Sequence, residues 1–150
     1  MYMKIALGSD HAGFTLKQLL LEKLKSEGYE VLDLGTDSLE SVDYPDFGEA
    51  VGKAVAGGEA DFGIACCGTG IGISIAANKV KGIRAAVVHD VSSAMLAREH
   101  NDANVLCFGA RLIGDVVAFD SVDAFLSATF EGGRHEKRIA KLSLLDEKNE

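Results

Sequence analysis

The sequence predicts an α/β fold with a five-stranded parallel sheet that is covered by helices on both faces. Five short apolar segments alternate with stretches of helical periodicity along the chain. A helix between two strands favours parallel pairing, because the crossover returns the chain to the same end of the sheet. The 150 residues contain no linker or low-complexity run, so we expect one domain over residues 1–150.

The expected elements follow one another in a regular order. Each expected strand is a short apolar run bounded by glycine or polar residues, and each expected helix has apolar residues on one face. The first helix, for example, has its leucines at helical spacing and meets Gly28 as a stop signal. The expected strands cover residues 3–8, 29–34, 62–66, 83–88 and 105–108. The expected helices cover residues 14–27, 47–56, 73–79, 92–99, 113–129 and, as an additional C-terminal helix, 134–145.

The longest irregular stretch covers residues 35–46. It contains the one proline of the chain, Pro45, next to Tyr44 and several acidic residues. Long loops in compact domains are often functional. We therefore expect Tyr44 to line a binding site.

Composition and cysteine usage exclude several classes of function. Asp and Glu number 23 against 15 for Lys and Arg, which gives a net charge of −8 and makes nucleic acid and anionic membranes poor partners. Neither a signal peptide nor an apolar window of about 20 residues is visible, so we expect a cytoplasmic protein. The three cysteines lack CxxC spacing, and we expect neither a disulfide framework nor a metal site.

The most informative stretch covers residues 62–79. The third expected strand ends at Cys66 and Cys67, whose side chains should point to opposite faces of the sheet. A glycine-rich loop follows, and its backbone N–H groups, together with those of the next helix, can form a cradle for an anion. Beside such a cradle we expect the pKa of the Cys67 thiol to be lowered. The competing interpretation is an ordinary turn after a core cysteine. The loop consists of Gly68, Thr69, Gly70, Ile71 and Gly72.

Several polar residues are expected at the same edge of the sheet. In parallel sheets the loops after the strands share one edge, where ligands bind. Applied to this chain, that rule gathers Asp10, His11, the 68–72 loop, His100, Asn101 and Arg111. Arg134 and Arg138, four residues apart on one helix face, can clasp a phosphate or simply face solvent.

These residue types suit an aldose–ketose isomerisation through an enediol. Cys67 would act as the base, and the loop amides with the Thr69 hydroxyl would stabilise the negative charge on oxygen. The imidazole of His100 is suited to proton transfer near neutral pH. Such a reaction requires neither a metal nor a nucleotide, so we expect no cofactor.

Six ordered motifs make the chain resemble the family of type B ribose-5-phosphate isomerases and galactose-6-phosphate isomerase subunits. The motifs are GSDHAGF (8–14), DYPDF (43–47), CGTGIGISIAANK (67–79), IRAA (83–86), REHNDANVLCFGAR (98–111) and FEGGRHEKR (130–138). The resemblance implies a three-layer α/β/α sandwich of Rossmann-like topology. It also implies a homodimer, possibly a tetramer, that interconverts ribose 5-phosphate and ribulose 5-phosphate, with the site near the subunit interface.

The resemblance also implies a role for individual residues. Cys67 matches the catalytic base, Thr69 an assisting hydroxyl, and His100 the acid that opens the sugar ring. The positions that match substrate-binding residues are Asp10, His11, Gly68, Thr69, Gly70, Ile71, Gly72, Asn101, Arg111, Arg134 and Arg138. Phe119, Phe125 and Phe130 are expected to leave apolar surface that a second subunit covers.

Three alternatives stay open on the sequence. The substrate could be a 6-phosphate hexose such as allose or galactose 6-phosphate. The fold could bind a phosphosugar without turnover. A nucleotide-binding enzyme is the third alternative, although the 68–72 loop is neither GxGxxG nor a Walker A motif.

Overall fold

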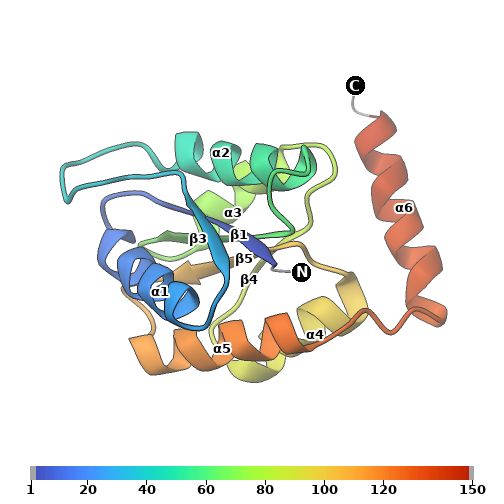
Figure 1. Ribbon diagram of the computed structural model, residues 1–150. Coiled ribbons are helices and arrows are strands. Elements are labelled where there is room, and N and C mark those ends of the chain that lie inside the picture. The colour runs from blue at the N-terminus through green and yellow to red at the C-terminus, as the bar shows by residue number, and fades with distance from the viewer. Residues whose placement is uncertain (1–2, 149–150) are drawn as a thin grey trace.

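The computed structural model describes residues 3–148, which form five strands and six helices (Figure 1). The strands are β1 (Lys4–Ser9), β2 (Glu30–Asp33), β3 (Phe62–Cys67), β4 (Ala85–Val87) and β5 (Val105–Gly109). The helices are α1 (Phe14–Ser26), α2 (Tyr44–Ala56), α3 (Ile71–Asn78), α4 (Val91–Asn101), α5 (Asp115–Ser127) and α6 (Arg134–Lys148). All of them lie within a few residues of their expected positions.

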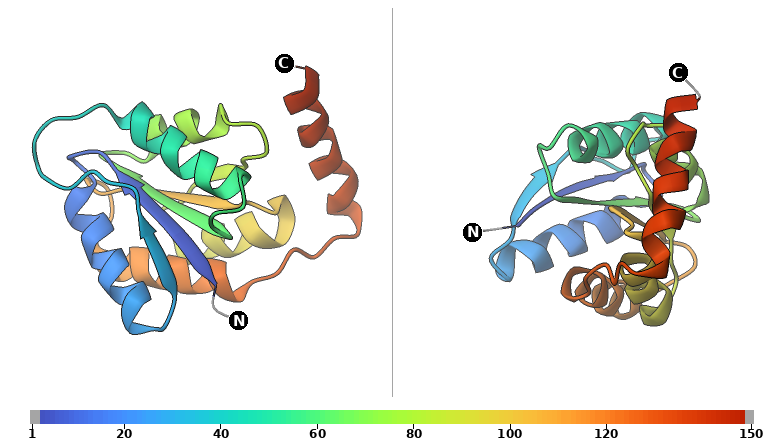
Figure 2. Two further views of the ribbon diagram at one scale, coloured as in Figure 1. Left: turned by 45° about the horizontal axis from the view of Figure 1, so that its top comes forward. Right: turned by 90° about the vertical axis from the view of Figure 1, so that its right-hand side faces the viewer.

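The sheet is parallel throughout, with the strand order β2-β1-β3-β5-β4. Helices α1, α4 and α5 pack on one face, and α2 and α3 pack on the other (Figures 1 and 2). The predicted three-layer α/β/α fold is therefore confirmed. From β1 the chain first adds β2 on one side and later β3 on the other. The loops after β1 and β3 therefore diverge and leave room for a ligand at the carboxyl ends of these strands.

Two large apolar clusters and a smaller one around Ala6 hold the layers together among the described residues. Leu24 of α1 and Phe125 of α5 are buried on one face of the sheet, and Val51 of α2 and Ile73 of α3 on the other. Burial of each such side chain contributes about 1.5–3 kcal/mol. Phe125 is only 1% exposed, so the expectation that it offers surface to a second subunit is wrong.

Two helix boundaries near the expected site differ from the sequence prediction. Helix α2 begins at Tyr44, earlier than expected, because Pro45 fits the first helical turn, where its missing N–H is not needed. Helix α4 continues to Asn101 and ends where Asp102 adopts a left-handed conformation. His100 therefore lies in the last turn of a helix instead of in a loop.

Helix α6 stands beside the layers, next to the β4 edge of the sheet (Figure 2). Its C-terminal half is tied to the domain by Asp146, whose Oδ2 accepts a hydrogen bond from the Gly82 N–H at 2.9 Å. Among the described residues of α6 only His135 is buried, while Leu142, Leu144 and Leu145 are about half exposed. None of the helices within residues 3–148 combines the length and apolar character that crossing a membrane requires.

Candidate active site

The carboxyl ends of β1 and β3 border a pocket of about 530 Å³, which we call the thiol pocket. It lies where the strand order predicts a ligand site, between the loops that follow these two strands. Its lining residues are Asp10, His11, Ala12, Tyr44, Cys67, Gly68, Thr69, Ile71, Gly72, Ile75 and Arg111. The structure therefore brings together most of the site residues that the sequence predicts.

Cys67 lies at the floor of the thiol pocket and is held by the loop that follows it. Its Sγ accepts a hydrogen bond from the Gly70 N–H at 3.1 Å, and the Thr69 Oγ1 accepts one from the Ile71 N–H at 3.2 Å. Gly70 has a φ of +79°, and a Cβ on it would come within 2.8 Å of the Phe108 carbonyl carbon. Only glycine fits this position, and the turn that it makes aims an N–H at the sulfur.

The other two cysteines have a different environment. Cys66 packs with the α1 side of the core and Cys67 with the α2 side, which confirms that the two side chains point to opposite faces. Burial, followed by the charge of the adjacent Cys67, raises the pKa of the Cys66 thiol. Burial also raises the pKa of the Cys107 thiol. Cys67 is thus the thiol that is placed to react.

Asp10 and His11 form the wall of the thiol pocket on the β1 side. Asp10 is 6% exposed, and its Oδ1 accepts a hydrogen bond from the Gly13 N–H at 3.0 Å, which shapes the turn into α1. The Nδ1 of His11 accepts a hydrogen bond from the Val42 N–H at 3.1 Å. An accepting Nδ1 places the proton of a neutral imidazole on Nε2, so His11 can donate a hydrogen bond to a ligand.

Arg111 and Tyr44 also line the thiol pocket, each beside a glycine of the loop. The Arg111 N–H donates to the Gly68 carbonyl at 3.0 Å, and a Cβ on Gly68 would lie 3.2 Å from its guanidinium. A Cβ on Gly72 would lie only 2.6 Å from the Tyr44 ring. Because the loop has glycine at both positions, a cation and an aromatic ring reach its backbone.

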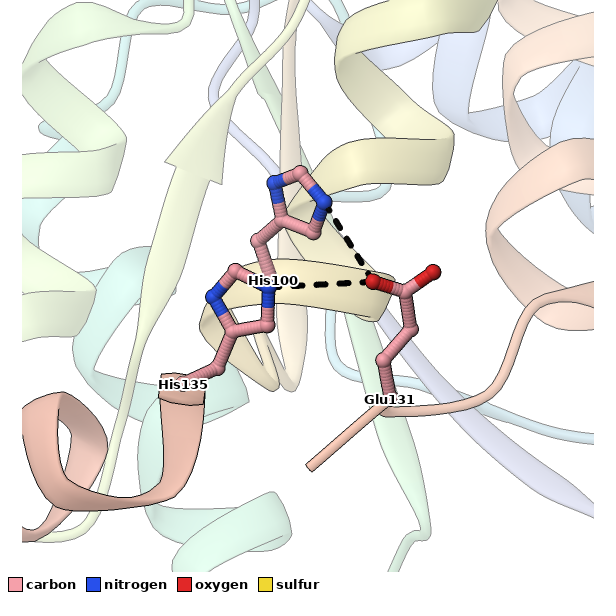
Figure 3. Close-up of side chains that lie close together, drawn as sticks. All are labelled: His100, Glu131 and His135. Atoms are coloured by element: carbon pink, nitrogen blue, oxygen red, sulfur yellow. Dashed lines mark ion pairs between the residues drawn. The ribbon is translucent and has the colours of Figure 1, made fainter. Parts of the chain in front are cut away.

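A second set of functional side chains lies elsewhere, in what we call the histidine cluster: His100, Glu131 and His135 (Figure 3). The rings of His100 and His135 stack with centroids 4.3 Å apart and an interplanar angle of 17°. The Glu131 Oε1 lies 3.5 Å from the His100 Nε2 and 3.7 Å from the His135 Nε2. Burial and then the neighbouring His100 lower the pKa of His135. The sequence pattern does not single out Glu131 or His135 as site residues, although their spacing of four residues is compatible with a pair on one helix face.

The prediction that His100 and Asn101 lie beside Cys67 is wrong within one chain. Both residues precede β5 and therefore lie at its amino end. There Val105 pairs with Gly63, whereas Cys67 pairs with Gly109 at the other end of the two strands. The strands separate these ends by about 13 Å.

The two arginines of α6 are also outside the thiol pocket. Arg134 and Arg138 lie on the first turns of α6 and act electrostatically on His135. Asn101 lines a separate cavity between α6 and β4. The structure thus divides the predicted site into two groups, the thiol pocket and a basic end that holds the histidine cluster, Asn101, Arg134 and Arg138.

Fold and pocket together define a class of protein. A thiol, a glycine-rich loop at the start of a helix and a nearby arginine share a pocket at the carboxyl edge of a parallel sheet. This combination is typical of an enzyme that moves protons on an anionic substrate. A family model described as Ribose/Galactose Isomerase matches residues 5–142, and the chain belongs to this family of isomerases.

Individual relatives agree with this assignment over nearly their whole length. The chain is 52% identical over 145 residues to ribose-5-phosphate isomerase B of Escherichia coli, covering 97% of each chain. The structure of Clostridium thermocellum ribose-5-phosphate isomerase B superposes with a TM-score of 0.97 at 55% identity, covering 99% of this chain and 100% of that one. Ribose-5-phosphate isomerase B of Mycoplasma genitalium with bound ribulose-5-phosphate gives 0.94 at 45% identity, covering 99% of each chain.

Proposed function

We propose that the protein interconverts D-ribose 5-phosphate and D-ribulose 5-phosphate, the isomerisation of the non-oxidative pentose phosphate pathway. The observation that carries the proposal is the Cys67 thiol, which lines the thiol pocket and accepts a hydrogen bond from the following loop. The relatives, one of them with bound ribulose-5-phosphate, support this choice of substrate. A cytoplasmic location fits an enzyme of central sugar metabolism.

The reaction needs one base that serves two neighbouring carbons. The thiolate of Cys67 removes the proton from C2 of the open-chain aldose and leaves an enediolate. The same proton is returned to C1, while the proton of the C2 hydroxyl passes to the oxygen on C1, so that the carbonyl moves from C1 to C2. The N–H groups of Gly72 and Ile73 have no acceptor within the first turn of α3. Together with the Thr69 hydroxyl they can stabilise the negative charge on oxygen.

The thiol pocket of one chain contains His11 and Arg111, but the acid that the resemblance assigns to ring opening and the arginine pair of α6 lie outside it. We infer that a second copy supplies them in a homodimer: His100 as the acid that opens the ring, Asn101 as a ligand of the sugar, and Arg134 and Arg138 as a clasp for the phosphate. Two facts support this inference. These residues lie together at the basic end, and α6, which carries the arginines, leaves its leucines exposed for a partner to cover.

A second candidate substrate is a 6-phosphate hexose. It is favoured by the family description, which names galactose as well as ribose. The ratio of kcat/KM values for ribose 5-phosphate, allose 6-phosphate and galactose 6-phosphate decides between the substrates. We expect the highest value for the pentose.

The proposed chemistry can be tested with two adjacent cysteines. Cys67→Ala should reduce kcat/KM for ribose 5-phosphate by about 10²–10⁴-fold, because general-base catalysis contributes that much. Cys66→Ala is the matched control, since its thiol packs on the other face of β3 and should leave kcat/KM nearly unchanged. Loss of activity in Cys66→Ala but not in Cys67→Ala would contradict the assignment of the base.

A further inference from the structure

The histidine cluster has the donor set of a transition-metal site. Two imidazole nitrogens and one carboxylate oxygen converge, and the ligating atoms of the three residues all lie within 4.8 Å of one another (Figure 3). The expectation of no metal site rested on local spacing, which does not show that these three residues meet in the fold. The cluster combines the end of α4 with the connection and first turn that lead into α6, which the fold brings together.

The separations fit a small, closely held cation. Zinc is bound tetrahedrally at about 2.0–2.1 Å from nitrogen and oxygen, which places neighbouring donors about 3.3 Å apart. The Oε1 of Glu131 lies 3.5 and 3.7 Å from the two Nε2 atoms. These two distances have to shorten by only a few tenths of an ångström, and the two imidazole nitrogens lie within 4.8 Å of each other.

The surroundings hold two of the three donors in place. The Glu131 N–H donates to the Glu99 carbonyl at 3.0 Å, and the His135 N–H donates to the Gly132 carbonyl at 3.1 Å. His135 is buried, whereas the His100 side chain is 35% exposed. Because the rings stack almost in parallel, one of them has to turn for both lone pairs to meet at one ion, and the more exposed His100 has room to do so.

We propose that His100, Glu131 and His135 form an inhibitory binding site for Zn²⁺ and similar borderline-soft divalent cations, with water as the fourth ligand. Imidazole and carboxylate donors select Zn²⁺, Co²⁺ and Ni²⁺ over Mg²⁺ and Ca²⁺, which prefer oxygen ligands in larger number. Arg134 and Arg138 oppose any cation, but both are exposed and screened by salt. Inhibition rests on the proposed function, in which His100 donates a proton, because the ring nitrogen that binds the ion has no proton to give. Binding of the metal does not rest on it.

Metal binding is measured on the purified full chain by competition of Zn²⁺ with a chromophoric chelator and by the visible absorption of bound Co²⁺. We expect one ion per chain. Glu131→Gln and His135→Asn should each weaken Zn²⁺ binding at least about tenfold, because even the outer partners of metal ligands contribute that much. Arg134→Gln should strengthen it. His89→Asn is the matched control, because His89 lies outside both the histidine cluster and the thiol pocket.

The thiol of Cys67 is the competing ligand, and its contribution is separable. In Cys67→Ala the affinity for Zn²⁺ should be unchanged. In the wild type, bound Co²⁺ should show no thiolate charge-transfer band in the near ultraviolet. Unchanged binding in Glu131→Gln and His135→Asn, or loss of binding in Cys67→Ala, overturns the site. Zn²⁺ should also inhibit the wild-type isomerase reversibly, and inhibit His135→Asn less, relative to its own metal-free rate. Binding without inhibition would confirm the site and contradict the proposed role of His100 in the reaction.

Discussion

The thiol pocket and the basic end use different parts of the chain to do their chemistry. In the thiol pocket the backbone supplies most of the contacts: the Gly70 N–H reaches the Cys67 sulfur, and glycines admit Tyr44 and Arg111. At the basic end the contacts come from side chains on the last turn of α4, the connection before α6 and the first turns of α6. The sheet fixes the position of the backbone groups in the thiol pocket. The side chains of the basic end are only as ordered as the helix ends that carry them. The first suits charge stabilisation and the second suits a surface that must meet a partner.

The largest expected effect tests whether the thiol pocket of one subunit works together with the basic end of the other subunit in a dimer. Cys67→Ala and His100→Ala should each be nearly inactive alone. When the two variants are mixed and their subunits exchange, half of the dimers contain one intact composite site, so activity should return to about one quarter of the wild-type value. Ribose 5-phosphate turnover is measured before and after exchange.

The control for this experiment places both lesions in the same region. A mixture of Cys67→Ala and Cys67→Ser should gain nothing, because no dimer of these variants has an intact thiol pocket. If differently tagged subunits exchange and the Cys67→Ala and His100→Ala mixture stays inactive, the composite site is wrong.

A smaller effect is expected where the thiol pocket depends on a buried side chain. Lys17 of α1 is 1% exposed, and its Nζ donates to the Asp33 Oδ1 at 2.6 Å and to the Thr36 carbonyl at 2.7 Å. These bonds fasten the loop after β2, which is itself hydrogen-bonded to Ser9 at the end of β1. Lys17→Met should lower the free energy of unfolding by about 2 kcal/mol, because the Thr36 carbonyl loses its partner.

The measurement is urea-induced unfolding, with Lys25→Met on the exposed side of the same helix as the control. Because Val42 of the same loop donates its N–H to His11, which lines the thiol pocket, Lys17→Met should also raise KM. Zn²⁺ binding at the histidine cluster should stay the same. Equal stability of the two variants would show that the buried lysine is dispensable.

The smallest effect concerns α4, the helix that carries His100. Asp90 caps its start, because the carboxylate Oδ1 accepts a hydrogen bond from the Ser93 N–H at 2.6 Å, and this bond holds the pKa of Asp90 below its ordinary value of 3.8. A lowered pKa in the folded state means that the charged cap stabilises the fold at neutral pH and that this contribution is lost in acid. Asp90→Ala should therefore lower Tm by a few degrees at about pH 7, and the difference should vanish as the pH falls through the folded pKa.

Asp43 offers the matched control for the cap. It stands at the same position before α2, but its side chain makes no capping hydrogen bond. Asp43→Ala should change Tm less than Asp90→Ala at neutral pH. A pH-independent difference between Asp90→Ala and the wild type would show that the charge of the cap is not what stabilises α4.

The sequence predicts the fold well because the hydrophobic pattern is regular. Strands such as 62–66 are continuous apolar runs and the first helix has leucines on one face, so the order of elements follows from local spacing. The order of the strands within the sheet does not follow from local spacing. That β5 lies between β3 and β4 depends on packing between distant segments, which no local pattern encodes.

The site was predictable where it follows a strand and not where it precedes one. Cys67 and Asp10 directly follow β3 and β1, so the rule for parallel sheets places them correctly. His100 and Asn101 look like loop residues in the sequence but belong to the end of α4, at the opposite edge. The pairing of His100 with Glu131 and His135 joins segments far apart in the chain, and only the folded structure reveals it.

The wide separation of Cys67 from the basic end has a consequence for how activity depends on concentration. If each active site takes Cys67 from one subunit and His100 from the other, a newly made chain has the catalytic thiol but cannot turn over substrate until it binds a second copy. Dilution below the dissociation constant of the pair would silence the enzyme without unfolding it. In such a dimer each subunit contributes to both sites. A chain that carries a defect in one of its two regions would therefore inactivate one of the two sites that it forms with an intact subunit.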